Sequence, residues 1–226
     1  KYMGIIAYGY AKWLKEQFDA AGIKRAYFVT RDGLAFKKAF EELYPGFDTR
    51  QIYGSGRMFM FACMRQYADI QPDLTGRELP GVTLRDFWKM LALDDEKLKN
   101  AYEAAFPDQL RFVGEKKEQL DAFLRAHESE LRRIGDIERK AINSYFMDIG
   151  LSEQKSAVVG LGWKGSILRG ITQVCKAEGI NADLTGYYLA THECDIHDLR
   201  TASYLLDHGK AGNIASPRHT VRRVQN

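Results

Sequence analysis

The sequence predicts an α/β fold in which a mainly parallel sheet is interrupted by a helical insertion. Two short apolar runs typical of buried strands, at 26–30 and 156–159, are each followed by a tight turn and a helical pattern. Between them, residues 72–150 contain charged helical patterns and no strand candidate. Strands that alternate with helices favour a parallel sheet with crossover connections. We therefore expect an α/β phosphosugar-binding core from 1–71 and 151–226, with 72–150 as the insertion or cap.

The first half of the core begins with a helix and continues through a strand, a tight turn and a second helix. Apolar residues at helical spacing predict an amphipathic helix over 4–21. The strand at 26–30 ends in the turn Thr30-Arg31-Asp32-Gly33, and a second helical pattern follows this turn. A short strand at 51–54 and a buried helix at 58–64 complete this half.

The insertion has the charged sequence of solvated helices. Thr83-Leu84-Arg85-Asp86 has the pattern of a capping box, and long helices are predicted over 94–106 and 115–149. The charge run Glu115-Lys116-Lys117-Glu118 is typical of a solvated helix face rather than of a binding surface.

The second half of the core resumes the alternation of strands and helices. The strand at 156–159 leads into the glycine-rich turn Gly162-Trp163-Lys164-Gly165-Ser166, and a helix then extends to Gly179. Another strand is predicted over 184–190. Ligands of parallel sheets bind at the carboxyl ends of the strands, so we expect both turns at one functional edge.

The composition excludes several classes of protein. The chain has 226 residues, 45% apolar and 28% charged, as in an ordinary globular protein. Its net charge of +3 comes mostly from the last residues, around Arg222, and gives no basis for nucleic-acid binding. No apolar run reaches the roughly 20 residues of a membrane span, and the N-terminus lacks the pattern of a secretory signal. Cys63, Cys175 and Cys194 are too far apart for a disulfide framework or a zinc site, which favours a reducing, cytoplasmic compartment.

The second turn has the composition of a phosphate-binding loop. A helix N-terminus exposes unpaired backbone N–H groups and the positive end of the helix dipole. Gly162 and Gly165 allow a phosphate to approach the backbone, the Ser166 hydroxyl can donate a hydrogen bond, and Lys164 supplies a positive charge. The alternative is a tight strand-to-helix turn whose glycines serve packing alone.

The first turn places a cation and a carboxylate at another strand end. Arg31 is suited to clamp a phosphate or diphosphate, and Asp32 to position Mg²⁺ or to accept a proton from a hydroxyl. The alternative is an ion pair between Arg31 and Asp32 within the turn. Ser55 and Arg57, just past the next strand, add further groups that can bind phosphate.

Other motifs are weaker. The segment from Gly160 to Gly165 matches the G-x-G-x-x-G fingerprint of dinucleotide binding, but no acidic residue ends a strand about 20 residues later, and Trp163 would crowd the pyrophosphate. His192 and His197 flank Cys194 without a second ligand cluster, so we interpret them as loop residues rather than metal ligands. The motifs of serine hydrolases and P-loop proteins are absent from the sequence.

Four segments together resemble one known domain: 22–33, 53–57, 158–166 and 186–188. In the same order and over nearly the whole chain, they are similar to the phosphoribosyltransferase-like glycosyltransferase domain that accompanies haloacid-dehalogenase-type phosphatase domains in bacterial surface-polysaccharide proteins. The combination of Arg-Asp-Gly with Gly-Trp-x-Gly-Ser is more specific than either motif alone. The resemblance implies a Rossmann-like or phosphoribosyltransferase-like sheet.

The resemblance also implies an activity. A 5-phosphoribosyl group would be transferred from phosphoribosyl diphosphate, with Mg²⁺, to a glycan hydroxyl. A haloacid-dehalogenase-type phosphatase in the same or a neighbouring chain would then remove the 5-phosphate, in the cytoplasm or at the inner face of the membrane within a biosynthetic complex. Asp32 and Arg31 would be catalytic, with Asp32 holding Mg²⁺. The donor would be bound by Arg31, Gly33, Ser55, Arg57, Gly162, Trp163, Lys164, Gly165 and Ser166.

The sequence departs from the family pattern at two places. Gly160 stands where family members carry Asp before the Gly-Trp pair, and Ser55-Gly56-Arg57 replaces a Ser-Arg-Arg-type segment. The chain also lacks the D-x-D-x-[TV] nucleophile motif of the phosphatase, so hydrolase activity would belong to a neighbouring domain. A non-catalytic phosphosugar-binding or docking domain is the alternative that Gly160 favours, and a dinucleotide-binding enzyme is a third.

Overall fold

The structure, a computed structural model, describes residues 2–163, 165–191 and 199–207. The chain forms two compact units, and the second unit, 57–142, interrupts the first, which contains residues 1–56 and 143–226. The insertion predicted from the sequence, 72–150, begins and ends later than the second unit does. The reason is packing, because apolar side chains that precede residue 72 are buried in the core of the second unit, whereas the chain from Asn143 onward packs in the first.

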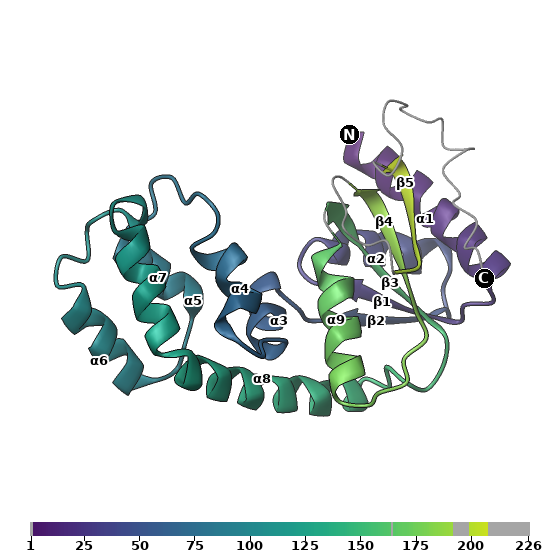
Figure 1. The fold of residues 1–226 in the computed structure, drawn as a ribbon. Coiled ribbons are helices and arrows are strands. Elements are labelled where there is room, and N and C mark those ends of the chain that lie inside the picture. The colour runs from purple at the N-terminus through teal and green to yellow at the C-terminus, as the bar shows by residue number, and fades with distance from the viewer. Residues whose placement is uncertain (1, 164, 192–198, 208–226) are drawn as a thin grey trace. The chain divides into compact units, whose positions relative to one another are not determined.

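The first unit is built on a five-stranded parallel sheet, which confirms the predicted α/β fold (Figure 1). The strands are β1 (Arg25–Val29), β2 (Asp48–Ile52), β3 (Ser156–Trp163), β4 (Leu184–Thr191) and β5 (Thr201–Asp207). Their order across the sheet is β2-β1-β3-β4-β5. β1 therefore lies between β2 and β3, and the order of the strands reverses between β1 and β3.

Helices cover both faces of this sheet. They are α1 (Tyr2–Ala21), α2 (Gly33–Leu43) and α9 (Ser166–Ala177). α1 and α2 pack on one face, where the rings of Phe18, Phe28 and Phe40 meet, and α9 packs on the other (Figure 1). Tyr10, Leu14 and Phe18 are fully buried at helical spacing, so the amphipathic helix predicted over 4–21 is confirmed.

Tyr10 ties α1 to the middle of the sheet. Its hydroxyl donates to the carbonyl of Tyr187 at 2.8 Å and lies 3.2 Å from the carbonyl of Gly160. Burial raises the pKa of Tyr10 well above its usual value, so the hydroxyl stays protonated and remains a donor. The backbone of β3 is thus fixed at Gly160, close to the end of β1.

The second unit consists of helices around its own apolar core. They are α3 (Gly56–Ala62), α4 (Tyr67–Leu74), α5 (Leu84–Leu91), α6 (Glu96–Ala105), the 3₁₀ turn η1 (Val113–Lys116), α7 (Lys117–Ala126) and most of α8 (Glu128–Asp148). Thr83 caps α5 as predicted, with its hydroxyl oxygen accepting from the Asp86 N–H at 3.1 Å. Gly135 of α8 lies against α3, since an added Cβ would be 2.3 Å from the Phe61 carbonyl oxygen.

Three elements differ from the sequence prediction. The short strand predicted over 51–54 is displaced toward the N-terminus, since β2 covers Asp48–Ile52. The single long helix predicted over 115–149 is wrong, because the chain breaks into η1, α7 and α8, and His127 separates the last two. The His127 ring packs on Phe123, and the backbone N–H of His127 donates to the carbonyls of Phe123 and Leu124. β5 was not predicted, because Thr-Ala-Ser-Tyr-Leu-Leu-Asp has neither an apolar run nor a clean alternation.

The C-terminal end of α8 is held in the first unit by side chains of β1 and β2. The carbonyl of Ile149 accepts from the Tyr27 hydroxyl at 2.8 Å and from Arg50 at 2.6 Å. The carbonyl of Gly150 accepts from Arg25 at 3.0 Å. Cations near a helix C-terminus also interact favourably with the helix dipole. These contacts place the segment that leads into β3 beside β1.

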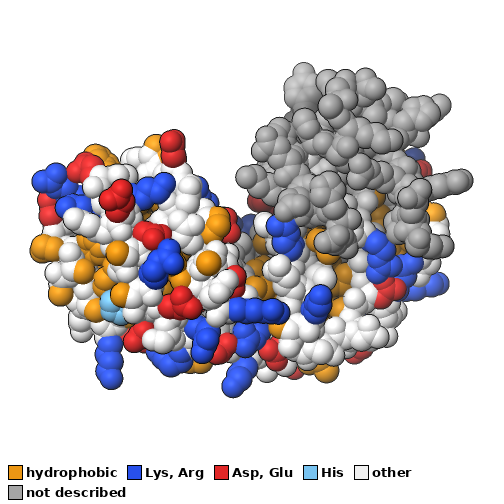
Figure 2. Space-filling model, viewed as in Figure 1, with side chains coloured by type: hydrophobic (Ala, Val, Ile, Leu, Met, Phe, Trp, Pro, Cys, Tyr) orange, Lys and Arg blue, Asp and Glu red, His pale blue; other side chains and the backbone are white. Residues whose placement is uncertain are grey.

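The surface carries charges of both signs. Lys and Arg side chains are interspersed with Asp and Glu on the face in view (Figure 2). Within the described ranges, no helix combines the length and the apolar character needed to cross a membrane.

The ion pair between Arg25 and Asp48 gives a pH-dependent test of the fold. Nε of Arg25 lies 2.6 Å from Oδ2 of Asp48, and the Arg25 side chain is only 8% exposed. Partial burial alone would raise the pKa of Asp48, but hydrogen bonds from Arg25 and Arg50 hold this pKa below its usual value. Ionised Asp48 therefore stabilises the fold above a pH of roughly 4, and this contribution is lost as the pH falls through the lower folded pKa.

We expect Asp48→Asn to lower the free energy of unfolding at neutral pH by roughly 1–2 kcal/mol, because the buried guanidinium of Arg25 keeps only Glu153 as a carboxylate partner. Urea unfolding from pH 7 down to about pH 3 should show the difference from wild type shrinking in acid. Asp19→Asn removes an exposed pair with Lys15 and serves as the control, with an expected loss below about 0.5 kcal/mol. A loss for Asp48→Asn that stays constant with pH would contradict this account.

Candidate functional site

The two predicted turns follow neighbouring strands. β1 and β3 are parallel, with Arg25 opposite Ser156 and Phe28 opposite Val159. Both turns therefore lie at the carboxyl edge of the sheet, at the point where the strand order reverses. Open parallel sheets bind their ligands at such a switch point. Because β3 extends to Trp163 whereas β1 ends at Val29, the second turn lies roughly 10 Å farther along the strand direction.

The first turn presents two exposed charged side chains. Arg31 and Asp32 are both exposed, and Asp32 occupies the N-cap position of α2 without a capping hydrogen bond from its side chain. In the part of the chain that the structure describes, no ion pair or side-chain hydrogen bond engages either residue, so the alternative of a mutual pair is not observed. Thr30 links the start of the turn to β2, because its N–H and its hydroxyl both donate to the Ile52 carbonyl. The peptide bond between Thr30 and Arg31 is cis.

Gly33 brings the start of α2 close to the sheet. It is buried, and an added Cβ would lie 3.3 Å from the backbone carbon of Phe28 and 3.5 Å from the carbonyl oxygen of Val159. The first turn of α2 therefore contacts both β1 and β3. Its N–H groups, which Asp32 does not cap, lie at the switch point.

The second turn depends on two glycines with positive φ. Gly162 has a φ of +116°, and a Cβ there would lie 1.8 Å from the carbonyl oxygen of Ala190 on β4. Gly165 has a φ of +67° and occupies the N-cap position of α9, again without a side-chain cap. Ser166 follows as the first, exposed residue of α9. Lys164 and the side chain of Trp163 lie outside the described part of the structure.

Gly160 lies inside β3, level with the end of β1. An added Cβ would meet Val29 and Tyr188 at 3.8–3.9 Å, which is ordinary van der Waals contact. A side chain at this position would therefore lie between Val29 of β1 and Tyr188 of β4, on one face of the sheet. Gly160 and Gly162 are both strand residues, whereas in the dinucleotide fingerprint the glycines form the turn itself.

The other two predicted phosphate-binding residues are placed differently. Ser55 is exposed and lies between β2 and α3 in the first unit. Arg57 belongs to the second unit, where its guanidinium is already engaged by three acceptors. Nε donates to the Leu91 carbonyl at 2.5 Å, Nη1 to the Glu138 carboxylate at 2.6 Å and Nη2 to the Ala92 carbonyl at 3.0 Å. A phosphate could bind Arg57 only by displacing these contacts.

An exposed aromatic residue at the same edge was not identified as a site residue from the sequence. Tyr53 follows the last residue of β2 and is 59% exposed. Its N–H donates to the Tyr145 hydroxyl at 3.0 Å, and the two rings lie 6.3 Å apart. A tyrosine directly after the apolar end of a strand is a sequence signal for an aromatic site residue. Its exposure depends on packing that the sequence does not show.

Within the described ranges, no group of three or more His, Cys, Asp or Glu residues is arranged to hold a metal ion. Asp32 is thus the one carboxylate among the predicted site residues. His192, Cys194 and His197 lie outside these ranges.

Comparison with known proteins adds no family assignment. No model of a known protein family matches the chain, and a search of curated proteins found no match.

Gly160 has room for a Cβ and Gly162 does not, so alanine substitutions at these two positions test the geometry of the second turn. Gly162→Ala should reduce the free energy of unfolding by about 3 kcal/mol or more, because a Cβ would collide with the Ala190 carbonyl and φ is unfavourable. Gly160→Ala is the matched control on the same strand and should change stability by less than about 1 kcal/mol. Urea unfolding followed by circular dichroism measures both, and equal losses would refute the geometry of this turn.

Proposed function

We propose that this chain is a phosphoribosyltransferase-like glycosyltransferase, which transfers a 5-phosphoribosyl group from phosphoribosyl diphosphate to a glycan hydroxyl in surface-polysaccharide synthesis. The observation that carries the proposal is the position of the two turns. Each one follows a neighbouring parallel strand at the switch point and leads into a helix N-terminus that no side chain caps. A donor with a phosphate at each end suits two anion-binding turns at one edge.

In this proposal the two turns bind opposite ends of the donor. Arg31 and the first N–H groups of α2 would bind the diphosphate, because a guanidinium forms paired hydrogen bonds with phosphate oxygens. Gly165, Ser166 and the first N–H groups of α9 would bind the 5-phosphate, with Lys164 and Trp163 completing this loop. Arg57 is left out, because its donors already serve the second unit.

The reaction would be a single displacement at C1 of the ribose. The acceptor oxygen forms the new bond to C1 while the bond from C1 to the diphosphate oxygen breaks, with inversion from the α-diphosphate to a β-linkage. Diphosphate leaves with the bonding electrons, and the proton of the acceptor hydroxyl passes to a base, for which Asp32 is the candidate. Positioning of the two substrates and stabilisation of the departing diphosphate would supply most of the rate enhancement.

Mg²⁺ fits this site as an ion that arrives with the donor. Proteins usually hold Mg²⁺ through one or two carboxylates together with substrate phosphates. Asp32 offers one exposed carboxylate at the switch point. Bound there, the ion would neutralise charge on the diphosphate. A carboxylate that holds Mg²⁺ on the leaving diphosphate cannot also take the proton of the acceptor, so this role of Asp32 is the alternative to its role as the base.

A non-catalytic role is the second candidate. Gly160 occupies the position where the resembling family carries Asp, so β3 supplies no carboxylate at this position. The chain would then be a phosphosugar-binding or docking domain that works with a haloacid-dehalogenase-type phosphatase. A dinucleotide-binding enzyme is less well supported, because Gly160 and Gly162 are both paired within β3, whereas the glycines of the dinucleotide fingerprint lie beyond the end of the strand.

Donor binding tests the proposal. Titration calorimetry with phosphoribosyl diphosphate and Mg²⁺ should show binding to wild type, and Arg31→Ala should weaken it roughly tenfold or more through loss of a charge-assisted contact. Lys38→Ala removes an exposed cation from α2, the helix that follows Arg31, and is the matched control, with unchanged affinity expected. Wild type that does not bind the donor, or equal affinities for Arg31→Ala and Lys38→Ala, would reject the assigned site.

An assay for released diphosphate separates the candidates. With galactose-, N-acetylglucosamine- and mannose-terminated oligosaccharides as acceptors, release that depends on the acceptor supports transfer. Donor binding without release across this panel favours the docking role, and saturable NAD binding by wild type in place of donor binding would favour a dinucleotide enzyme. Gly160→Asp restores the family acid and should raise turnover if that carboxylate contributes to the reaction.

A further inference from the structure

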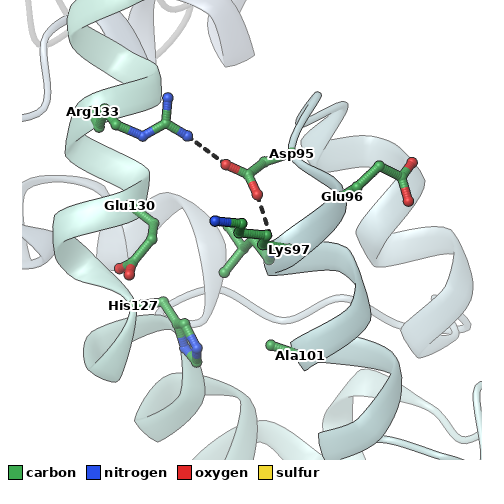
Figure 3. Close-up of a pocket in the computed structure, with 8 residues that line it drawn as sticks. Asp95, Glu96, Lys97, Ala101, His127, Glu130 and Arg133 are labelled. Atoms are coloured by element: carbon green, nitrogen blue, oxygen red, sulfur yellow. Dashed lines mark hydrogen bonds and ion pairs between the residues drawn. The ribbon is translucent and has the colours of Figure 1, made fainter.

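The second unit contains a hollow between the start of α6 and the junction of α7 with α8 (Figure 3). Its volume is about 640 Å³, within the range of roughly 300–1,000 Å³ of small-molecule sites. Lys97, Leu98 and Ala101 line it from α6, and His127, Glu130 and Arg133 from the junction and α8. The hollow belongs entirely to the second unit, so it is distinct from the two turns of the first unit.

One wall of the hollow is fixed by an internal ion pair. Arg133 of α8 donates to the Asp95 carboxylate, whose other oxygen accepts from the Leu98 N–H at 2.9 Å and so caps α6. The Asp95 side chain is 12% exposed. The hydrogen bond from the Leu98 N–H and the nearby Arg133 hold the pKa of Asp95 below its usual value. These two charges therefore neutralise each other, and the pair links α6 to α8.

A cation and an anion face each other across the remaining space. Lys97 extends from α6 toward the side of the hollow that carries Glu130 (Figure 3). The Ser129 hydroxyl donates to Oε2 of Glu130 at 2.7 Å, and this bond lowers the pKa of Glu130, which is therefore ionised at neutral pH. Among the described residues, no ion pair joins Lys97 to Glu130. The ammonium group of Lys97, which can only donate hydrogen bonds, thus lies opposite the carboxylate of Glu130, which can only accept them.

His127 provides a fixed ring at the lower end of this space. A carbonyl oxygen only accepts, so the 2.8 Å contact with the Phe123 carbonyl makes Nδ1 of His127 the protonated nitrogen. In the neutral ring Nε2 is then an acceptor. The ring also packs on Phe123, with centroids 4.2 Å apart, and this contact fixes its orientation.

We propose that the hollow binds a neutral saccharide through its hydroxyl groups. A hydroxyl both donates and accepts, so neighbouring hydroxyls can donate to Glu130 and accept from Lys97 at the same time. A phosphate would be repelled by Glu130 and a simple cation by Lys97, because the Asp95–Arg133 pair is internally neutral. An apolar ligand would leave the ionised groups desolvated and unpaired. Ala101, which is partly exposed, offers an apolar contact for the C–H face of a sugar ring.

The inference goes beyond the proposed function and does not require it. A saccharide in the second unit would supply the acceptor class that the proposed transfer needs. Its binding can be measured without phosphoribosyl diphosphate, and the donor site can be measured without a saccharide. Failure of one site therefore leaves the other testable.

Nuclear magnetic resonance titration of the full chain tests the hollow. Methyl β-galactopyranoside, N-acetylglucosamine and methyl β-ribofuranoside are the probes, with glycine and inorganic phosphate as charged comparisons. At least one saccharide should shift the backbone signals of Lys97, Ala101 and Glu130 in a saturable way. Glu130→Gln and Lys97→Met should each weaken that binding about tenfold, as expected for loss of a hydrogen bond to a charged group.

Matched variants and comparisons decide the outcome. Glu103→Gln changes an exposed carboxylate elsewhere on α6 and should bind the saccharide as wild type does. Circular dichroism of each variant checks that the helices are retained. No saturable shift from any saccharide would overturn the proposal. So would tighter binding of glycine or phosphate in the hollow, or equal affinities for Glu130→Gln and Glu103→Gln.

Discussion

The parallel pairing of β1 with β3 is the contact on which the candidate site depends. The whole second unit separates these strands in the sequence, so the chain must return to the open side of β1 in the correct register. Side chains of β1 and β2 direct this return. Arg25 and Tyr27 bind the carbonyls at the end of α8, and Arg25 also pairs with Glu153, shortly before Ser156 takes its place opposite Arg25. A shift of this register would move the second turn away from the first.

Close backbone contacts then bring two helix N-termini to the same edge. The absence of a Cβ at Gly33 lets α2 approach Val159 of β3 as well as its own strand, and the absence of one at Gly162 lets β3 pass close to the Ala190 carbonyl. The N–H groups that begin α2 and α9 are uncapped by side chains. Glycine at these positions therefore links the packing of the strands to the orientation of the helix amides, which the proposed function assigns to phosphate binding.

The sequence predicted what local pattern determines and missed what depends on tertiary packing. Apolar runs and turn residues were sufficient to predict the parallel α/β core, the helical insertion and the two turns that follow neighbouring strands. The engagement of Arg57 by carbonyls of α5 and by Glu138 has no local signal, so its donors looked available. The break at His127 was hidden because the charged helical pattern continues through it. The predicted boundaries of the insertion differ from those of the second unit, because they were placed where the charged helical pattern begins and ends and not where buried contacts change.

The two units differ in the charge arrangement that they offer to a ligand. At the switch point, Arg31 and two sets of helix N–H groups combine positive potential with one exposed carboxylate, Asp32, which favours an anionic ligand that carries a cation. In the hollow, Lys97 faces Glu130 and the Asp95–Arg133 pair is internally neutral, so a net charge of either sign meets repulsion. A transfer between a diphosphate donor and an uncharged hydroxyl needs both kinds of recognition. In the two proposals these kinds of recognition would belong to separate units, the α/β unit and the helical unit, so each could be altered by substitutions that leave the other unit unchanged.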